Sequence, residues 1–147
     1  MPVEKQRLKV YVDGTFYNNM YGGGYVVIEN ENIIYQDCGI GKNEPELLSM
    51  RNISGEMTAA MRATNWLYKN KRKGTIVHDY VGLSKWVLSE WKTNKKFTKM
   101  YADWMRPFYN KGIIDFEWVK GHSNVVGNEI ADRLAKQSVK CNQEWKF

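Results

Sequence analysis

The sequence predicts an α/β fold in which a five-stranded mixed sheet, three antiparallel strands followed by parallel strands, is flanked by helices. Three apolar segments near the N-terminus are joined by short turns, as in an antiparallel meander. Beyond residue 53, segments with helical spacing alternate with short apolar runs, which favours strands reached through helices. The predicted order of elements is therefore βββαβααβα.

The N-terminal strands are predicted at 8–13, 25–28 and from 33 onward. The first, Leu8-Lys9-Val10-Tyr11-Val12-Asp13, alternates and is rich in β-forming residues. Asn18-Asn19 and three glycines at 22–24 predict a turn after it. A second turn is expected at 29–32, and a polar loop is expected from Gly41 to Asn52.

The C-terminal part is predicted to contain four helices and two strands. Ser54 is expected to be the N-cap of the first helix, which runs to about Asn70. A strand reached through a helix should lie parallel to a neighbour, with a right-handed crossover. The other helices are expected at 81–91, 98–109 and 128–139, and the strands at 75–79 and 113–119.

Length and composition favour one folded domain. The 147 residues match a single domain over 1–147, with a core at about 5–140. Hydrophobic residues make up 43% and charged residues 26%, which excludes wholesale disorder. No apolar run reaches the ~18 residues of a membrane span, and no signal peptide is visible. We expect a cytoplasmic monomer without a membrane segment or a small-molecule cofactor.

Charge and cysteine usage narrow the class further. The net charge of +6 favours a polyanionic partner, and aromatic residues between cations suit stacking on bases. Cys38 and Cys141 form neither a CxxC motif nor a zinc spacing. Reduced thiols are expected, although the sequence leaves one disulfide open.

Four carboxylates stand at positions that suit a metal site. Asp13 and Asp79 end predicted strands, and Glu56 and Asp132 fall near the start of predicted helices. Each acid also has an ordinary explanation, as a turn residue or as a complement to a helix dipole. Four clustered carboxylates would repel one another, and hard divalent cations such as Mg²⁺ would offset that repulsion. A pair of such ions ~4 Å apart suits in-line displacement at phosphorus.

These residues lie in motifs that resemble those of ribonuclease HI. The motifs occur in the family order from Asp13 to Ala135, and the last two are the most specific. They are Val12-Asp13-Gly14-Thr15, Gly55-Glu56-Met57-Thr58-Ala59-Ala60, His78-Asp79-Tyr80, Trp118-Val119-Lys120-Gly121-His122-Ser123 and Asn128-Glu129-Ile130-Ala131-Asp132-Arg133-Leu134-Ala135.

The resemblance implies the ribonuclease H fold and cleavage of the RNA strand of an RNA/DNA hybrid, leaving 5′-phosphate and 3′-hydroxyl ends. It implies that Asp13, Glu56, Asp79 and Asp132 hold two Mg²⁺ ions, with Mn²⁺ as an alternative and Asp13 as the bridge. His122 would assist proton transfer or product release from a loop.

The resemblance also implies substrate contacts. Asn19 would contact the minor groove, and Asn52 would lie near the DNA phosphate and sugar. Gly14 would permit close approach to the RNA strand, and Thr15 and Phe16 would line the same groove. The segment between Asp79 and His122 is shorter than in family members that have a full basic protrusion. The remaining candidates for gripping DNA are Trp91, Lys92, Lys95 and Lys96, which are equally readable as a solvated loop.

Other interpretations remain beside this one. The chain could be a catalytically silent nucleic-acid-binding domain, or another nuclease or strand-transfer enzyme of the same superfold. His78 should point away from Asp79, because neighbours on a strand face opposite sides. Glu129 could orient His122 or a metal-bound water, or only decorate its helix. The aromatic segment 142–147 is expected to dock onto the domain, with a partner motif as the alternative.

Overall fold

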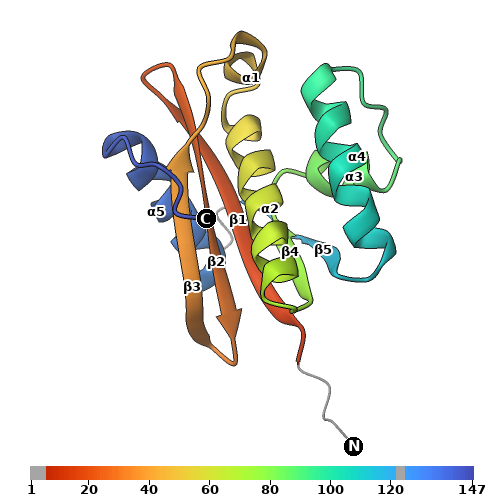
Figure 1. The fold of residues 1–147 in the computed structure, drawn as a ribbon. Coiled ribbons are helices and arrows are strands. Elements are labelled where there is room, and N and C mark those ends of the chain that lie inside the picture. The colour runs from red at the N-terminus through yellow and green to blue at the C-terminus, as the bar shows by residue number, and fades with distance from the viewer. Residues whose placement is uncertain (1–5, 122–124) are drawn as a thin grey trace, which may run out of the picture.

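The protein was analysed as a computed structural model, which describes residues 6–121 and 125–147. Ten elements follow one another along the chain (Figure 1). The strands are β1 (Leu8–Tyr17), β2 (Met20–Glu29), β3 (Asn32–Ile40), β4 (Gly74–His78) and β5 (Ile114–Trp118). The helices are α1 (Pro45–Ser49), α2 (Asn52–Lys69), α3 (Gly82–Val87), α4 (Lys96–Asn110) and α5 (Val126–Lys140).

The strands form one mixed sheet in the order β3-β2-β1-β4-β5. β1, β2 and β3 pair antiparallel, as the meander predicted. β4 lies parallel to both β1 and β5. The predicted fold class, three antiparallel strands followed by parallel strands, is therefore confirmed.

Helices α2 and α5 cover opposite faces of the sheet (Figure 1), and the glycines of β2 show why they approach so closely. A Cβ at Gly23 would lie 2.3 Å from the Gly55 carbonyl oxygen of α2. A Cβ at Gly24, which faces the other side, would lie 2.7 Å from Leu134 Cβ of α5. Alternate residues of a strand face opposite sides, so consecutive glycines let a helix backbone approach each face.

Several local predictions were wrong, and the tertiary contacts explain why. Glycines 22–24 lie inside β2 and not in a turn. They are glycines because a side chain at these positions would clash with the helices packed on the sheet. The expected loop at 41–52 contains α1, whose Glu44 side chain accepts the Glu46 N–H at the N-cap. Ser54 lies inside α2, where its hydroxyl donates to the Leu47 carbonyl at 2.6 Å.

Other boundaries also moved. β1 continues to Tyr17, so Asp13 lies within the strand and not at its end. The helix expected at 81–91 stops at Val87, and α4 begins two residues earlier than expected. No helix among residues 6–121 and 125–147 is long and apolar enough to cross a membrane.

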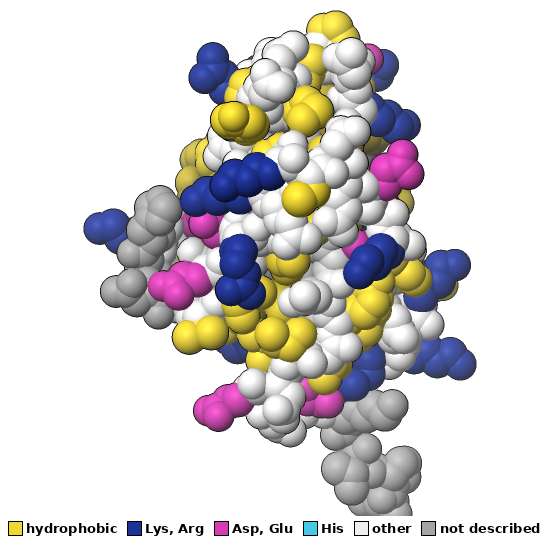
Figure 2. All heavy atoms as spheres, turned by 90° about the vertical axis from the view of Figure 1, so that its left-hand side faces the viewer, with side chains coloured by type: hydrophobic (Ala, Val, Ile, Leu, Met, Phe, Trp, Pro, Cys, Tyr) yellow, Lys and Arg dark blue, Asp and Glu magenta, His cyan; other side chains and the backbone are white. Residues whose placement is uncertain are grey.

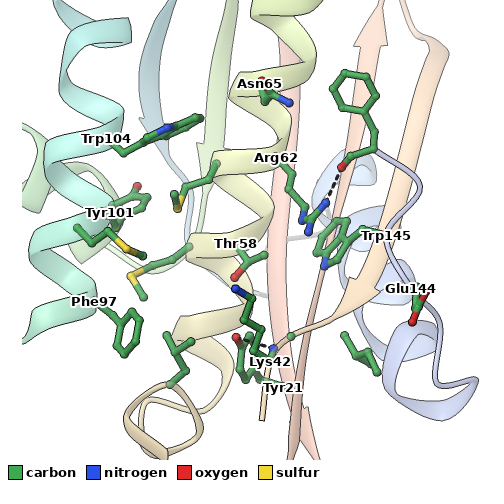
Figure 3. Close-up of a pocket in the computed structure, with 17 residues that line it drawn as sticks. Tyr21, Lys42, Thr58, Arg62, Asn65, Phe97, Tyr101, Trp104, Glu144 and Trp145 are labelled. Carbon is green, nitrogen blue, oxygen red and sulfur yellow. Dashed lines mark hydrogen bonds between the residues drawn. The ribbon is translucent and has the colours of Figure 1, made fainter. Parts of the chain in front are cut away.

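The C-terminal segment docks onto the domain, as predicted. The Gln143 carbonyl accepts the Ile40 N–H at 2.9 Å, which attaches the segment to β3. Trp145 stacks on Tyr25, with ring centroids 6.1 Å apart. Arg62 of α2 lies over the Trp145 ring and donates to the Phe147 carbonyl oxygen at 2.7 Å (Figure 3). Cys38 is buried and Cys141 exposed, and both are free thiols.

Candidate active site

The parallel pairing of β1 with β4 brings Asp13 and Asp79 together. Tyr11 lies opposite Val77, so the residues two positions further along each strand are also neighbours. Asp79 directly follows β4, while Asp13 is still paired with Gly24 of β2. Both carboxylates therefore lie near the carboxyl end of β4, where α/β sheets commonly bind ligands.

Glu56 reaches the same place from the first part of α2. A Cβ at Gly14 would lie 2.1 Å from the Asn52 carbonyl oxygen and 2.4 Å from the Glu56 nitrogen. A Cβ at Gly55 would lie 1.9 Å from the Gly22 carbonyl oxygen. Only glycine lets the start of α2 lie this close to β1 and β2. The missing side chain of Gly14 thus lets α2 approach β1, and Gly14 also lines the carboxylate pocket.

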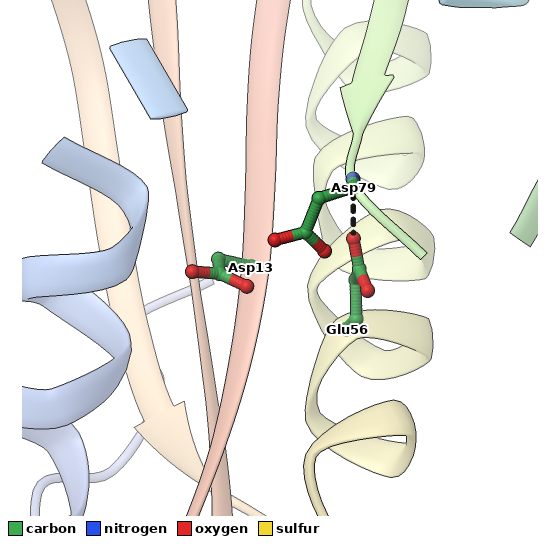
Figure 4. Close-up of side chains that lie close together, drawn as sticks. All are labelled: Asp13, Glu56 and Asp79. Atoms are coloured by element: carbon green, nitrogen blue, oxygen red, sulfur yellow. Dashed lines mark hydrogen bonds between the residues drawn. The ribbon is translucent and has the colours of Figure 1, made fainter. Parts of the chain in front are cut away.

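The three carboxylates converge tightly (Figure 4). One oxygen from each of Asp13, Glu56 and Asp79 can be chosen so that all lie within 4.8 Å of one another. Glu56 Oε1 also accepts the Asp79 N–H at 3.2 Å, and Asp13 Oδ1 accepts the Gly14 N–H at 2.9 Å. These backbone donors orient the acids but do not neutralise three negative charges.

The electrostatics of the cluster favour protons over charge when no cation is bound. Burial, followed by the charges of Asp79 and Asp132, raises the pKa of Asp13 to about 8. Burial, followed by the charges of Asp79 and Asp13, raises the pKa of Glu56 well above its usual range. Glu56 is only 1% exposed. A bound cation would reverse this preference.

Asp132 lines the same pocket from α5 but makes a different contact. Its Oδ2 lies 2.9 Å from Nζ of Lys136, one turn further along the helix. The pocket has a volume of about 260 Å³. Its lining is almost entirely polar: Asp13, Gly14, Asn52, Asp79, Asn128, Glu129 and Asp132.

A second, more open groove begins beside this pocket. Its volume is about 800 Å³, and Asn52 lines both cavities. Trp91, Lys92 and Lys95 lie along it, together with Arg51. The aromatic side is built by Tyr80, Trp86 and Trp91, whose rings contact one another. Two of the three predicted lysines thus lie in a groove that shares Asn52 with the carboxylate pocket.

The remaining predicted residues lie elsewhere. Lys96 is not among the lining residues of this groove, and its Nζ lies 5.3 Å from the Phe97 ring centroid. Thr15 and Phe16 are half-buried in β1, and Asn19 is exposed in the turn before β2. His122 lies outside the described residues. His78 is buried, and its Nδ1 lies 2.8 Å from the Tyr80 carbonyl oxygen.

Three residues near the site were not singled out from the sequence. Arg51 has a positive φ of 54° and holds its guanidinium 5.5 Å from the Phe16 ring centroid, and no sequence signal indicated this. Asn128 is buried in the carboxylate pocket, and its Oδ1 has no hydrogen-bond partner within the described parts of the chain. Trp118 hydrogen-bonds to Asp79. Both Asn128 and Trp118 stood in quoted motifs without a role.

The donor set restricts the metal chemistry. Carboxylate oxygens, with no thiolate or imidazole among the three converging residues, suit hard divalent cations. The arrangement is that of a candidate site for a divalent cation near the strand ends of an α/β sheet.

Comparisons with known proteins identify the family. The model of the RNase H family matches residues 5–140. A ribonuclease H of Francisella tularensis subsp. novicida is 33% identical over 148 residues, covering 92% of this chain and 93% of that protein. The chain therefore belongs to the ribonuclease H family and is a ribonuclease H.

Solved structures agree in fold. RNase H1 from the archaeon Halobacterium salinarum NRC-1 superposes with a TM-score of 0.76 at 18% identity, covering 92% of this chain and 99% of the other. LC11-RNase H1, crystallised in complex with an RNA/DNA hybrid, superposes with a TM-score of 0.70 at 13% identity, covering 90% and 99%. Both show the same fold as this chain.

Proposed function

We propose that this ribonuclease H hydrolyses the RNA strand of RNA/DNA hybrids with two Mg²⁺ ions, leaving 5′-phosphate and 3′-hydroxyl ends. The observation that carries the proposal is the convergence of Asp13, Glu56 and Asp79 within 4.8 Å, beside a groove that carries Lys92 and Lys95. The solved complex of LC11-RNase H1 with an RNA/DNA hybrid supports the choice of substrate.

Each of the four carboxylates would contribute ligands to one or both ions. Asp13 would bridge the ions, as the resemblance to the family implies, and Asp79 and Asp132 both lie close enough for their charges to raise the pKa of Asp13. Glu56 and Asp79 would complete one side, and Asp132 the other. Bound divalent cations supply an activated water and stabilise the leaving 3′-oxygen. Mn²⁺ has the same oxygen preference and would substitute.

The open groove would receive the DNA strand. Lys92 and Lys95 are exposed and would contact phosphates, while Trp91, 40% exposed, would pack on sugars or bases. Asn52 lines both cavities and would contact the hybrid between its two strands. A-like hybrids are read by shape and 2′-hydroxyls, so little sequence preference is expected. Gly14, Thr15, Phe16 and Asn19 are proposed on the RNA side, with Lys96 as an outer phosphate contact.

On the β3 and α5 side, the Lys and Arg side chains of the described residues are scattered rather than aligned (Figure 2). Figure 2 shows Lys and Arg side chains on that face separated by hydrophobic and acidic ones. Phosphate binding needs several cations along one path. We therefore propose the groove near Lys92 and Lys95, and not this face, as the site of hybrid binding.

We further propose that residues 1–147 act as one ribonuclease H domain, monomeric and cytoplasmic. One sheet containing both early and late strands supports the single domain. The two free thiols support a reducing compartment.

A cleavage assay tests the proposed function. End-labelled RNA is placed in RNA/DNA, RNA/RNA and DNA/DNA duplexes with Mg²⁺, Mn²⁺ or EDTA. We expect cleavage only of RNA in the hybrid, abolished by EDTA and by Asp13→Asn. Asp115→Asn, which alters an exposed strand residue paired with Arg7, is the matched control. Hybrid binding without cleavage would support a silent domain instead, and DNA cleavage another nuclease branch.

The groove is tested by salt dependence. Lys95→Ala should raise KM for the hybrid about two- to fivefold and reduce the slope of log KM against log salt by about one, because one phosphate contact is lost. Lys111→Ala, at the opposite end of α4, is the control. An unchanged slope would argue that Lys95 is only solvated.

A further inference from the structure

Asp79 lies just beyond the regular hydrogen bonding of β4. The pairing of β4 with β5 ends at His78 opposite Trp118, and the Val119 N–H donates to the His78 carbonyl at 2.8 Å. The peptide groups of Asp79 therefore have no partner in the ladder. Peptide groups without a ladder partner are held by side chains or solvent.

Two side chains from different elements hold these peptide groups. Glu56 Oε1 of α2 accepts the Asp79 N–H at 3.2 Å. On the other side, the indole Nε1–H of Trp118 donates to the Asp79 carbonyl oxygen at 2.9 Å. The backbone of Asp79 is thus clamped between α2 and the end of β5.

Trp118 makes this hydrogen bond although most of its side chain is not buried. It is 55% exposed, although tryptophan has one of the largest apolar surfaces to bury. The chain that follows passes the Asp79 carboxylate, because a Cβ at Gly121 would lie 3.5 Å from Asp79 Oδ2. The indole bond therefore ties Asp79 to the segment that leads out of β5.

We propose that Trp118 is a positioning residue that holds the Asp79 carboxylate in register with Asp13 and Glu56 through its indole N–H. The inference rests on the proposed function, since it assigns Asp79 to the metal site. Without the bond, the Asp79–Tyr80 peptide can rotate, and the carboxylate moves with it. Residues that orient ligands in this way typically change metal affinity or activity by about 10- to 100-fold when mutated.

Trp118→Phe tests the proposal, because it keeps an aromatic ring and removes only the N–H donor and part of the ring. Mg²⁺ is titrated while thermal unfolding is followed without substrate, and kcat and KM are measured with the hybrid. We expect the Mg²⁺ midpoint to rise about tenfold, within the range for such orienting residues. The value of kcat should fall about five- to tenfold at fixed Mg²⁺, as one lost hydrogen bond predicts, with KM changed less than about twofold.

Trp104→Phe is the matched control. Trp104 is half-buried on α4, where its ring packs on Phe108, and it should leave the Mg²⁺ midpoint unchanged. A lower melting temperature of Trp118→Phe with an unchanged Mg²⁺ midpoint would reduce Trp118 to a structural role and overturn the proposal. A raised KM with an unchanged midpoint would show a direct hybrid contact and also overturn it.

The experiments distinguish failure of the proposed activity from failure of the role proposed for Trp118. If the wild-type protein does not cleave the hybrid, the proposed function fails, whereas the Mg²⁺ titration still tests the clamp. If the wild type cleaves and Trp118→Phe behaves as Trp104→Phe in both assays, the clamp fails alone.

Discussion

Two groups of buried acids in this protein are treated very differently by their surroundings. Asp37 of β3 is 2% exposed, and its carboxylate accepts the N–H groups of Cys38, Lys146 and Phe147 at 2.9–3.1 Å. Asp13 and Glu56 are buried to a similar degree, yet their nearest charged neighbours are other carboxylates. Asp37 accepts three backbone N–H groups, whereas Asp13 and Glu56 accept fewer and are surrounded by other acids.

The different partners indicate a structural role for Asp37 and a functional role for Asp13 and Glu56. Three N–H donors stabilise a carboxylate without a counter-ion, so Asp37 can hold the C-terminal segment as part of the fold. In the carboxylate pocket, the fewer N–H donors to Asp13 and Glu56 do not offset burial and the neighbouring acids, so their pKa values are raised and keeping them charged costs stability unless a cation binds. Burial alone therefore does not identify a functional acid. The partners of the acid do.

The largest expected effect is on catalysis. Asp13→Asn removes the proposed bridging charge, and loss of several kcal/mol of transition-state stabilisation corresponds to a kcat lower by on the order of 10³-fold or more. Asp37→Asn should retain kcat within about twofold per folded molecule, since Asp37 lies outside the carboxylate pocket. Single-turnover hybrid cleavage measures both. Comparable losses in the two variants would show that Asp37 also contributes to catalysis.

For stability, substitution of Asp37 should cost more than substitution of Asp13. Asp37→Ala removes the acceptor of the N–H groups of Lys146 and Phe147 in the C-terminal segment, and these two charge-assisted bonds, at about 1.5–3 kcal/mol each, predict a loss of about 3–6 kcal/mol in the free energy of unfolding. In EDTA, Asp13→Asn should instead be neutral or stabilising, because it relieves repulsion. Urea unfolding in EDTA gives both values. Asp115→Ala, an exposed control, should cost less than ~1 kcal/mol.

The stability of the metal-free protein should depend on pH because the pKa of Asp13 is raised. The pKa of Asp13 is raised to about 8, against about 3.9 in the unfolded chain. The unfolded state therefore binds fewer protons between about pH 4 and pH 8, and the free energy of unfolding of the metal-free protein falls as the pH rises through this range. Saturating Mg²⁺ should remove much of that fall, and metal binding should strengthen toward pH 8.

Thermal melts from pH 5 to 8.5, in EDTA and in Mg²⁺, measure this linkage. Asp13→Asn should show a shallower fall in EDTA than the wild type. Identical slopes for the two proteins would mean that Asp13 does not titrate in this window.

The smallest effect concerns the tail contact itself. A Cβ at Gly39 would lie 2.4 Å from Trp145 Cγ, so Gly39→Ala should push the segment off β3 and cost about 1–3 kcal/mol, as overpacking does. Trp145→Ala removes the same contact, and the double variant should cost little more than Trp145→Ala alone. Additive losses would show that Gly39 matters for another reason, and cleavage should remain unchanged throughout.

Much of the fold was predictable because its signals are local. Alternation in 8–12 and the apolar runs near 76 and 114 identified strands, and helical spacing identified α2, α4 and α5. Predictions failed where tertiary contacts override a local preference. Glycines read as a turn are strand residues under two helices, and Ser54, read as a cap, bonds to Leu47 from inside α2.

The carboxylates were predictable as a set, but their geometry was not. Asp13, Glu56 and Asp79 were predicted to meet, and they do, within 4.8 Å. Asp132 shares their pocket while its carboxylate pairs with Lys136, which spacing alone did not indicate. The clamp on Asp79 was also hidden, because it depends on the parallel register that puts Trp118 opposite His78.

The family resemblance, the element order and the candidate acids could be predicted from residue types and spacings, which are properties of the chain. Which groups surround each buried acid depends on the folded structure. Asp37 and Asp13 are both strand aspartates, and most of the groups that surround each carboxylate are distant from it in the sequence. Hydrogen-bond donors from residue 146 reach the first, and carboxylates from residues 79 and 132 influence the second. Such contacts between distant parts of the chain exist only after folding, and they decide where charge is stable and where a cation is needed.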